Sequence, residues 1–278
     1  MLKVGLIGHG AIGKLVAESI LHSTHGLSSS RISLVAILVN SAREQTHVGN
    51  AIITNDPSIF FGSEFDICIE CAGQPAVRQH AVNVLSKGIN FLCTSIGALT
   101  NDALMEEIKQ AAIDGKSQFS LASGAMPAID WMSSSALEPG SIVTAIQTKP
   151  PKSWIGARYE PFTTNQLPDV IDFSTLDKPH IFFEGTARDA ASSYPKNSNV
   201  LAMLAISTAG LDETQVKLVA DPLDTTMRQT IEYNGSAGKI VVNVVGKCSP
   251  TNPRTSQIVP LSVIKALRNM SSPISIGL

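Results

Sequence analysis

The feature that most constrains the fold is a regular alternation of strand and helix patterns over residues 1–125. Short apolar runs rich in β-branched residues are separated by segments in which apolar residues recur at helical spacing. Such alternation favours a parallel sheet with helices on both faces. The predicted strands are 2–7, 31–40, 65–73, 89–95 and 117–123, and the predicted helices are 11–23, 75–88 and 101–115.

The first strand runs into a glycine-rich turn, "VGLIGHGAIGKL", at residues 4–15. In a GxGxxG turn between strand and helix, the first glycine allows the tight turn, the second admits a pyrophosphate and the third lets helix and strand pack closely. The helix N-terminus then offers N–H groups to the phosphates. We therefore predict a Rossmann-type, doubly wound domain that binds a dinucleotide; a purely structural turn is the alternative. The predicted contacts are Gly8, Gly10, Ala11, Ile12 and Gly13, with further contacts at Ala72 and Ser95.

The end of the second predicted strand bears on which dinucleotide binds. An acidic residue there would bind the ribose 2′-hydroxyl of NAD, but this chain reads "LVNSAR". Asn40 can still bond a ribose hydroxyl, whereas Ser41 and Arg43 can receive a 2′-phosphate. This pattern favours NADP, or use of both NADP and NAD; a solvated Arg43 is the alternative.

Beyond Ala125 the pattern changes. Strands are predicted at 141–148, 181–185, 214–221, 227–234 and 238–246, and short turns between the last three favour a largely antiparallel sheet. Helices are predicted at 186–194, opened by Thr186, and at 199–210, and a long loop at 155–180. The predicted organisation is a dinucleotide-binding domain at 1–125, a second α/β domain at 126–254 and a last helix within 255–278.

Charge and composition argue against several other classes of protein. The net charge of −2 supplies no basic field for nucleic acid or an anionic membrane, and no run of about 20 apolar residues predicts a membrane span. The N-terminus does not resemble a signal peptide, so we expect a cytoplasmic protein. The "CIEC" cysteines lie in a predicted buried strand and are read as core thiols, and no residue cluster has the spacing of a metal site.

The second half carries more specific motifs. "SGAMPAID", "TKPPK", "FEGTARDAASSYPKNSNV", "GLDETQVKLVADP" and "NPRTS" follow the glycine turn in this order. Together they resemble the L-aspartate dehydrogenase family from the first strand to the last helix. The resemblance implies NAD- or NADP-dependent oxidation of L-aspartate to iminoaspartate, which hydrolyses to oxaloacetate and ammonia, or the reverse reaction. It also implies a homodimer formed through the second domain, a last helix that packs on the first domain, and nicotinamide contacts from Ala125 and Asn199.

The chain departs from the family at the catalytic acid/base. The family has an N-x-H pattern a few residues after "ADP", where this chain has Met227 and Gln229, and no histidine follows His180. An amide can hydrogen-bond but cannot carry a proton near neutral pH. Family glycines after "SGA" are also replaced, by Pro127 and Ala128.

Two interpretations of this departure stay open. In the first, Gln229 orients the substrate and another group moves protons; the candidates are Lys149, Lys152, Tyr194, Glu232 and His180. In the second, the substrate differs, and the enzyme is an NADPH-dependent imine or keto-acid reductase. A nucleotide-binding homologue without catalysis is a third possibility. Our predicted catalytic residues are Gln229 and Lys149, and the predicted substrate contacts are Lys149, Lys152, Asn199, Thr255 and Ser256.

Overall fold

The computed structural model describes residues 1–41, 46–155, 173–195, 198–249 and 252–277, with backbone alone for 248, 249 and 252–255. By internal contacts the chain divides into two units. Unit 1 comprises Met1–Gly124 and Ile258–Leu278, and unit 2 comprises Ala125–Gln257. No helix among the described residues is long and apolar enough to cross a membrane.

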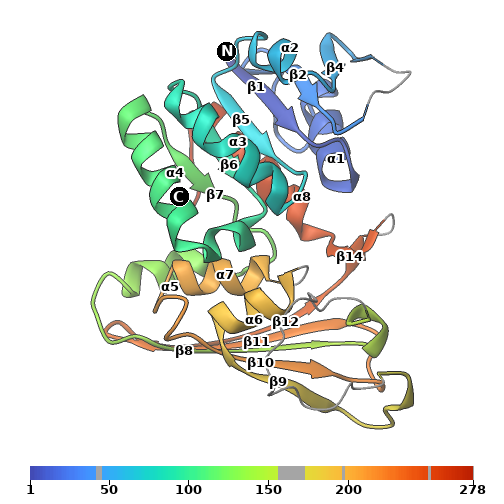
Figure 1. Ribbon diagram of the computed structural model, residues 1–278, viewed down its shortest axis with the longest axis vertical. Coiled ribbons are helices and arrows are strands. Elements are labelled where there is room, and N and C mark those ends of the chain that lie inside the picture. Colours follow the sequence, from blue (N-terminus) through green and yellow to red (C-terminus); the bar gives the residue numbers. More distant parts are fainter. Residues whose placement is uncertain (42–45, 156–172, 196–197, 250–251, 278) are drawn as a thin grey trace. The chain divides into compact units, whose positions relative to one another are not determined.

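Unit 1 is built on a seven-stranded sheet with the order β3-β4-β2-β1-β5-β6-β7 (Figure 1). All neighbouring strands run parallel except β3, which pairs antiparallel with β4. The chain moves outward from β1 first toward β2 and then toward β5, so the order reverses at β1, where doubly wound sheets bind ligands. The strands are β1 (Leu2–Ile7), β2 (Ile32–Leu38), β3 (His47–Val48), β4 (Ala51–Thr54), β5 (Ile67–Glu70), β6 (Asn90–Cys93) and β7 (Phe119–Leu121).

The helices of unit 1 follow the predicted alternation. The α1 helix (Ala11–Leu21) packs against the last helix, α8 (Ile258–Ser271), and α3 (Gln74–Ser86) packs against α4 (Asp102–Gly115). The first residue of the predicted helix 101–115 caps α4, because Asn101 Oδ1 accepts a hydrogen bond from the Leu104 N–H at 2.9 Å. The predicted α/β fold with a Rossmann-type sheet is therefore confirmed.

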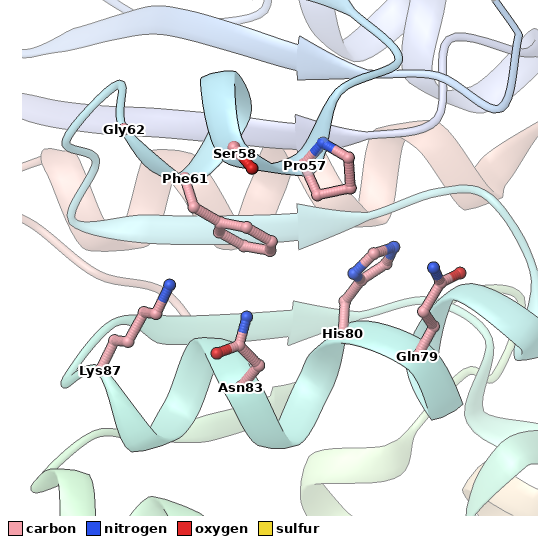
Figure 2. Close-up of a pocket in the computed structure, with 8 residues that line it drawn as sticks. All are labelled: Pro57, Ser58, Phe61, Gly62, Gln79, His80, Asn83 and Lys87. Carbon is pink, nitrogen blue, oxygen red and sulfur yellow. The ribbon is translucent and has the colours of Figure 1, made fainter.

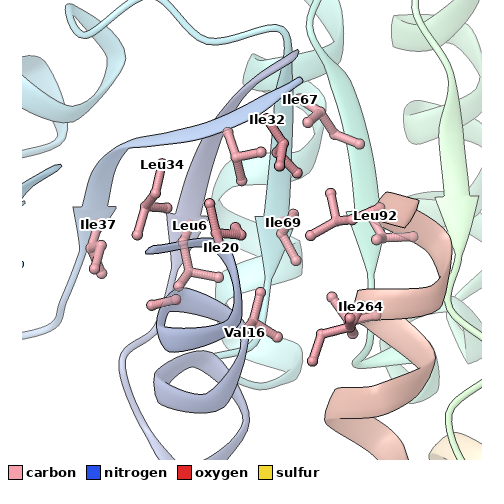
Figure 3. Packing of buried hydrophobic residues seen from close by; sticks show 14 of the residues in the cluster. Leu6, Val16, Ile20, Ile32, Leu34, Ile37, Ile67, Ile69, Leu92 and Ile264 are labelled. Carbon is pink, nitrogen blue, oxygen red and sulfur yellow. The ribbon is translucent and has the colours of Figure 1, made fainter. Parts of the chain in front are cut away.

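The core of unit 1 joins both ends of the chain. Leu6 of β1 and Ile69 of β5 pack with Val16 of α1 and Ile264 of α8 in one buried cluster (Figure 3). Ser262 Oγ of α8 also accepts a hydrogen bond from the Gly124 N–H at 3.1 Å. Burial of these apolar surfaces, worth roughly 25 cal/mol per Å², ties the last helix to the sheet of this unit.

Unit 2 holds a five-stranded sheet with the order β12-β11-β8-β10-β9. It is largely antiparallel, as predicted, although β8 and β10 run parallel. The helices α5 (Ile129–Ser135), α6 (Ala187–Ser193) and α7 (Asn199–Ile206) lie along one face of it (Figure 1). The strands are β8 (Ile142–Lys149), β9 (His180–Thr186), β10 (Gln215–Ala220), β11 (Met227–Gly235) and β12 (Gly238–Gly246), and a separate β13 (Cys248–Ser249) pairs with β14 (Asn252–Ser256).

Several short elements had no sequence prediction: β3, β4, α5, and the single turn α2 (Pro57–Phe61). A strand of two or four residues leaves too few positions for an apolar period to be recognised. The α2 turn depends on a local cap, since Asp56 Oδ1 accepts a hydrogen bond from the Ser58 N–H at 2.7 Å. Ala128, at one of the two positions where the resemblance implies family glycines, precedes α5 in the left-handed region with φ of 54°.

Candidate cofactor and substrate sites

Two glycines of the glycine-rich turn after β1 leave no room for a side chain. Gly8 has a φ of +98°, and a Cβ there would lie 2.7 Å from the Cys71 carbonyl oxygen. A Cβ on Gly13 would collide with the carbonyl oxygen of Gly8. The turn can therefore keep this shape only with glycine at both positions.

Gly10 is different, because a Cβ at this position would meet no atom within 4 Å. It is exposed and immediately precedes α1, whose N-terminus has no side-chain cap. The first N–H groups of a helix have no partner within the helix, and the positive end of the helix dipole lies there. An open glycine beside an uncapped helix N-terminus fits the pyrophosphate of a dinucleotide, which the N–H groups of Ala11, Ile12 and Gly13 would hold.

This geometry gives a first testable prediction. Gly10→Ala fills only open space in the protein alone, so we expect the free energy of unfolding to stay within about 0.5 kcal/mol of the unchanged chain. The added methyl group occupies the approach of the pyrophosphate, so the dissociation constant for NADPH is expected to rise at least about tenfold. Fluorescence titration and thermal unfolding measure the two effects, and equal NADPH affinity would contradict the assignment.

A buried carboxyl group organises the loops after β5 and β6. Glu70, the last residue of β5, is fully buried. Its Oε1 accepts hydrogen bonds from the N–H groups of Ala72 and Gly73, both at 2.7 Å, and from the Ser95 hydroxyl at 2.9 Å. Its Oε2 accepts from the N–H groups of Thr94 at 3.2 Å and Ser95 at 3.0 Å. One side chain thus positions both loops that carry the predicted cofactor contacts Ala72 and Ser95.

Sequence reasoning missed Glu70, which stands inside the quoted stretch "CIEC". An acidic residue in an otherwise apolar strand was the available signal, because buried acids are rare unless they are hydrogen-bonded. Its neighbours Cys68, Cys71 and Cys93 are free thiols. Burial, followed by the nearby Glu70, raises the pKa of each thiol well above its usual value. These cysteines are therefore protonated and poor nucleophiles.

The end of β2 leaves Asn40 and Ser41 exposed, where a ribose or its phosphate could reach them. Arg43 lies outside the described residues. Ala72 is exposed, whereas Ser95 is buried within the Glu70 network.

In unit 2, the side chains of two predicted catalytic residues and of one neighbouring glutamine share the buried face of the sheet. Gln147 and Lys149 of β8 are each 6 % exposed, and Gln229 of β11 is 7 % exposed. Residues two apart on a strand share a face, and Gln147 is the register partner of Gln229. The structure therefore brings the two predicted catalytic residues, Lys149 and Gln229, to one face of this sheet.

Lys149 is held near an aromatic cluster. Its Nζ lies 4.8 Å from the centroid of the Trp154 ring, and Trp154 Nε1 donates a hydrogen bond to the Val219 carbonyl oxygen at 3.1 Å. Phe182 and Tyr194 pack edge-on against the same indole. Trp154 was also missed from sequence, although a tryptophan directly after the rigid "PPKS" segment was a visible signal.

An ion-pair network joins the start of β11 to the segment that follows β10. Arg228 donates to Asp221 Oδ2 at 2.8 Å and lies 2.5 Å from Asp224 Oδ2. Hydrogen bonds from Thr226 lower the pKa of Asp224. Because strand alternation directs Arg228 away from the face of Gln229, this guanidinium belongs to the network of Asp221 and Asp224.

The remaining predicted residues of unit 2 are more scattered. Lys152, Asn199 and His180 are exposed, and Asn199 is the first residue of α7. Glu232 lies on the face of β11 opposite to Gln229 and pairs with Lys239 at 3.3 Å. The other positions are Ala125, the half-buried first residue of unit 2; Ser256, half-buried at the end of β14; and Thr255, for which only the backbone is described.

An open pocket of about 510 Å³ lies between α2 and α3 (Figure 2). Lys87 Nζ lies 4.7 Å from the Phe61 ring centroid, and burial lowers the pKa of His80. None of the predicted cofactor or substrate residues lines this pocket. Within the described part of the chain, no three His, Cys, Asp or Glu residues are grouped so as to hold a metal ion.

Comparison with known proteins gives a family match for each of the two units. Residues 8–121 match the family model described as homoserine dehydrogenase, NAD binding domain, and residues 130–270 match aspartate dehydrogenase, C-terminal. The L-aspartate dehydrogenase of Pseudomonas aeruginosa is 35% identical over 99% of this chain and 100% of its own length, and that of Cupriavidus necator is 34% identical with the same coverage.

The fold has a solved counterpart as well. The crystal structure of aspartate dehydrogenase from Thermotoga maritima matches over 100% of both chains with a TM-score of 0.72, at 21% identity. The NAD-binding match and the glycine turn together indicate a nicotinamide dinucleotide as cofactor. The chain belongs to the L-aspartate dehydrogenase family of NAD(P)-dependent oxidoreductases.

Proposed function

We propose that the protein oxidises the C–N bond of L-aspartate, or runs the reverse reductive amination. The observation that carries this proposal is similarity over the full length to relatives named L-aspartate dehydrogenase. NAD(P) supplies the acceptor for the hydride that leaves the substrate Cα. Loss of that hydride and one N–H proton gives iminoaspartate, to which water adds and from which ammonia leaves to yield oxaloacetate.

The chain's own residues are proposed to bind and orient the substrate. Lys149 pairs with a substrate carboxylate, and its burial beside Trp154 strengthens that attraction because little water screens it. Gln229 hydrogen-bonds the substrate without exchanging a proton. In its neutral amine form Lys149 is also proposed to take the N–H proton that leaves the substrate, and in its ammonium form to return that proton in the reverse reaction. Lys152, Asn199, Thr255 and Ser256 complete the proposed substrate contacts, and Ala125 and Asn199 those to the nicotinamide.

Cofactor preference and assembly are parts of the same proposal. The absence of an acidic residue directly after β2, together with an exposed Ser41 that could receive a 2′-phosphate, favours NADP, or use of both NADP and NAD. A homodimer is supported by apolar side chains on the sheet face opposite the helices, where Ile142 and Val245 are each 67% exposed. A cytoplasmic location is proposed from the sequence. Light scattering of the purified protein measures the oligomeric state.

The activity test follows absorbance of the reduced nicotinamide. L-aspartate is offered with NAD⁺ and NADP⁺, and oxaloacetate with ammonia and either reduced cofactor, over about pH 6 to 11 so that a lysine and a histidine would both titrate. Turnover with aspartate supports the proposal. Tight NADPH binding without aspartate turnover, but with reduction of other imines or keto acids, would replace it with the reductase function that the neutral Gln229 favours.

Gln229→Ala is expected to lower kcat/KM for L-aspartate about 10- to 100-fold, because one hydrogen bond to a charged substrate is lost. Affinity for NADPH should stay unchanged, since unit 1 carries the glycine turn. Thr230→Ala is the matched control, as Thr230 is the next residue along β11 and bonds Asn243 on the other face. Unchanged turnover of Gln229→Ala would remove this residue from the substrate site.

A further inference from the structure

Gln147 was not among the predicted site residues, yet it lies directly opposite Gln229 in the antiparallel pairing of β8 and β11. Both side chains are more than nine-tenths buried. Side chains of directly opposite residues lie on the same face with Cβ atoms about 5 Å apart. Two amide groups therefore stand side by side on the buried face of this sheet.

Both amides hold a buried atom with no hydrogen-bond partner in the protein: Gln147 Oε1 and Gln229 Nε2. Among the described residues only three other buried polar side-chain atoms share this state, and none of them is a register partner of another: Ser33 Oγ, Thr214 Oγ1 and Tyr233 Oη. A buried acceptor and a buried donor without partners destabilise the fold, so this pair calls for an explanation. A ligand that bonds both atoms would supply that explanation.

The neighbouring groups indicate what kind of ligand that is. Gln147 supplies an acceptor, Gln229 supplies a donor, and Lys149, two residues along β8 on the same face, supplies an ammonium group. A dicarboxylic amino acid offers the complementary set, namely two carboxylates and one nitrogen that carries hydrogens.

We propose that Gln147 contacts the substrate nitrogen, with Oε1 accepting a hydrogen bond from its N–H, while Gln229 Nε2 donates to a carboxylate. This inference rests on the proposed function and deepens it, because it assigns the recognition of the amine to a residue outside the predicted site. An amide that does not titrate holds the nitrogen equally well in the amine and imine states, both of which carry N–H.

Binding of two ligands to the enzyme loaded with NADPH tests the assignment. L-aspartate cannot react with the reduced cofactor, and succinate has both carboxylates but no nitrogen. Gln147→Leu is expected to weaken L-aspartate binding at least about tenfold and to leave succinate binding within about twofold. Gln229→Leu is expected to weaken both ligands. Isothermal titration measures the affinity of each variant for each ligand, relative to the unchanged enzyme. The matched control is Gln215→Leu, because Gln215 is exposed on β10 of the same sheet.

Thermal unfolding provides a readout that does not depend on the ligand. Replacing an unpartnered buried amide with an apolar group of similar size leaves stability equal or higher, so the melting temperature of Gln147→Leu should not fall. Gln147→Met serves as the second variant of matched volume. A clear fall in both variants would show that the amide bonds within the protein, and would overturn the inference.

The remaining outcomes separate this inference from the proposed function. If the unchanged enzyme turns over aspartate and Gln147→Leu binds it equally well, the inference alone fails. Equal weakening of aspartate and succinate by Gln147→Leu likewise overturns the contact to nitrogen. If the unchanged enzyme neither binds nor turns over aspartate, the proposed function fails and the inference fails with it.

Discussion

Glu70→Gln is expected to destabilise unit 1 by about 2 to 6 kcal/mol and to weaken NADPH binding at least about tenfold. Each carboxyl oxygen of Glu70 accepts from two backbone N–H groups. An amide at this position directs its own donors at one of these pairs, so two buried N–H groups lose their acceptor, at about 1 to 3 kcal/mol each. The loops that carry Ala72 and Ser95 are then no longer held in place.

Urea-induced unfolding and NADPH fluorescence titration measure the two effects. Glu107→Gln is the matched control, because Glu107 is exposed on α4 and the same substitution there should change stability by less than about 0.5 kcal/mol. A Glu70→Gln protein that unfolds at the same urea concentration as the control, and binds NADPH equally well, would show that the network does not position the cofactor loops.

Gly13→Ala is the second substitution with a large expected effect. A single methyl group at this position would collide with the Gly8 carbonyl oxygen, which belongs to the backbone and cannot rotate away. Overpacking of this kind typically costs about 1 to 3 kcal/mol, and helix α1 must shift relative to the turn. We expect unfolding at lower temperature and a rise of at least about tenfold in the dissociation constant for NADPH.

Gly10→Ala is the control for Gly13→Ala, since both add the same methyl group to the same turn. Only Gly13→Ala is expected to change stability, whereas both should weaken NADPH binding. Calorimetry of the two variants without cofactor decides this. Equal melting temperatures for Gly13→Ala and the unchanged chain would mean that the helix and strand pack less closely here than the structure shows.

The sequence predicted the large elements well because their signals are local. The glycine turn, the apolar run of β1 and the cap of α4 by Asn101 each depend on residues within a few positions of one another. The parallel pairing of β8 with β10 had no such signal, since residues 150–214 separate the two strands. The short strand β4 and the turn α2 were missed for a related reason, as too few residues carry their pattern.

Some residues of the candidate site could likewise be recognised from local sequence, whereas others could not. Gly8, Gly10 and Gly13 are recognised from spacing alone, and the structure adds only which of them a methyl group would disturb. The role of Glu70 depends on donors from residues 72, 73, 94 and 95, and those loops meet only after β5 and β6 pair in the sheet.

The alternating α/β fold could be recognised in the residue pattern, as could the glycine turn that predicts a dinucleotide site and the prediction that Gln229 stands where the family has a histidine, because spacing and residue type carry that information along the chain. The position of Gln147 opposite Gln229, and of Lys149 on the same buried face, became visible once the strands were paired. Register between β8 and β11 is set by packing of residues far apart in the chain, and a shift of one residue would direct every one of these side chains to the other face.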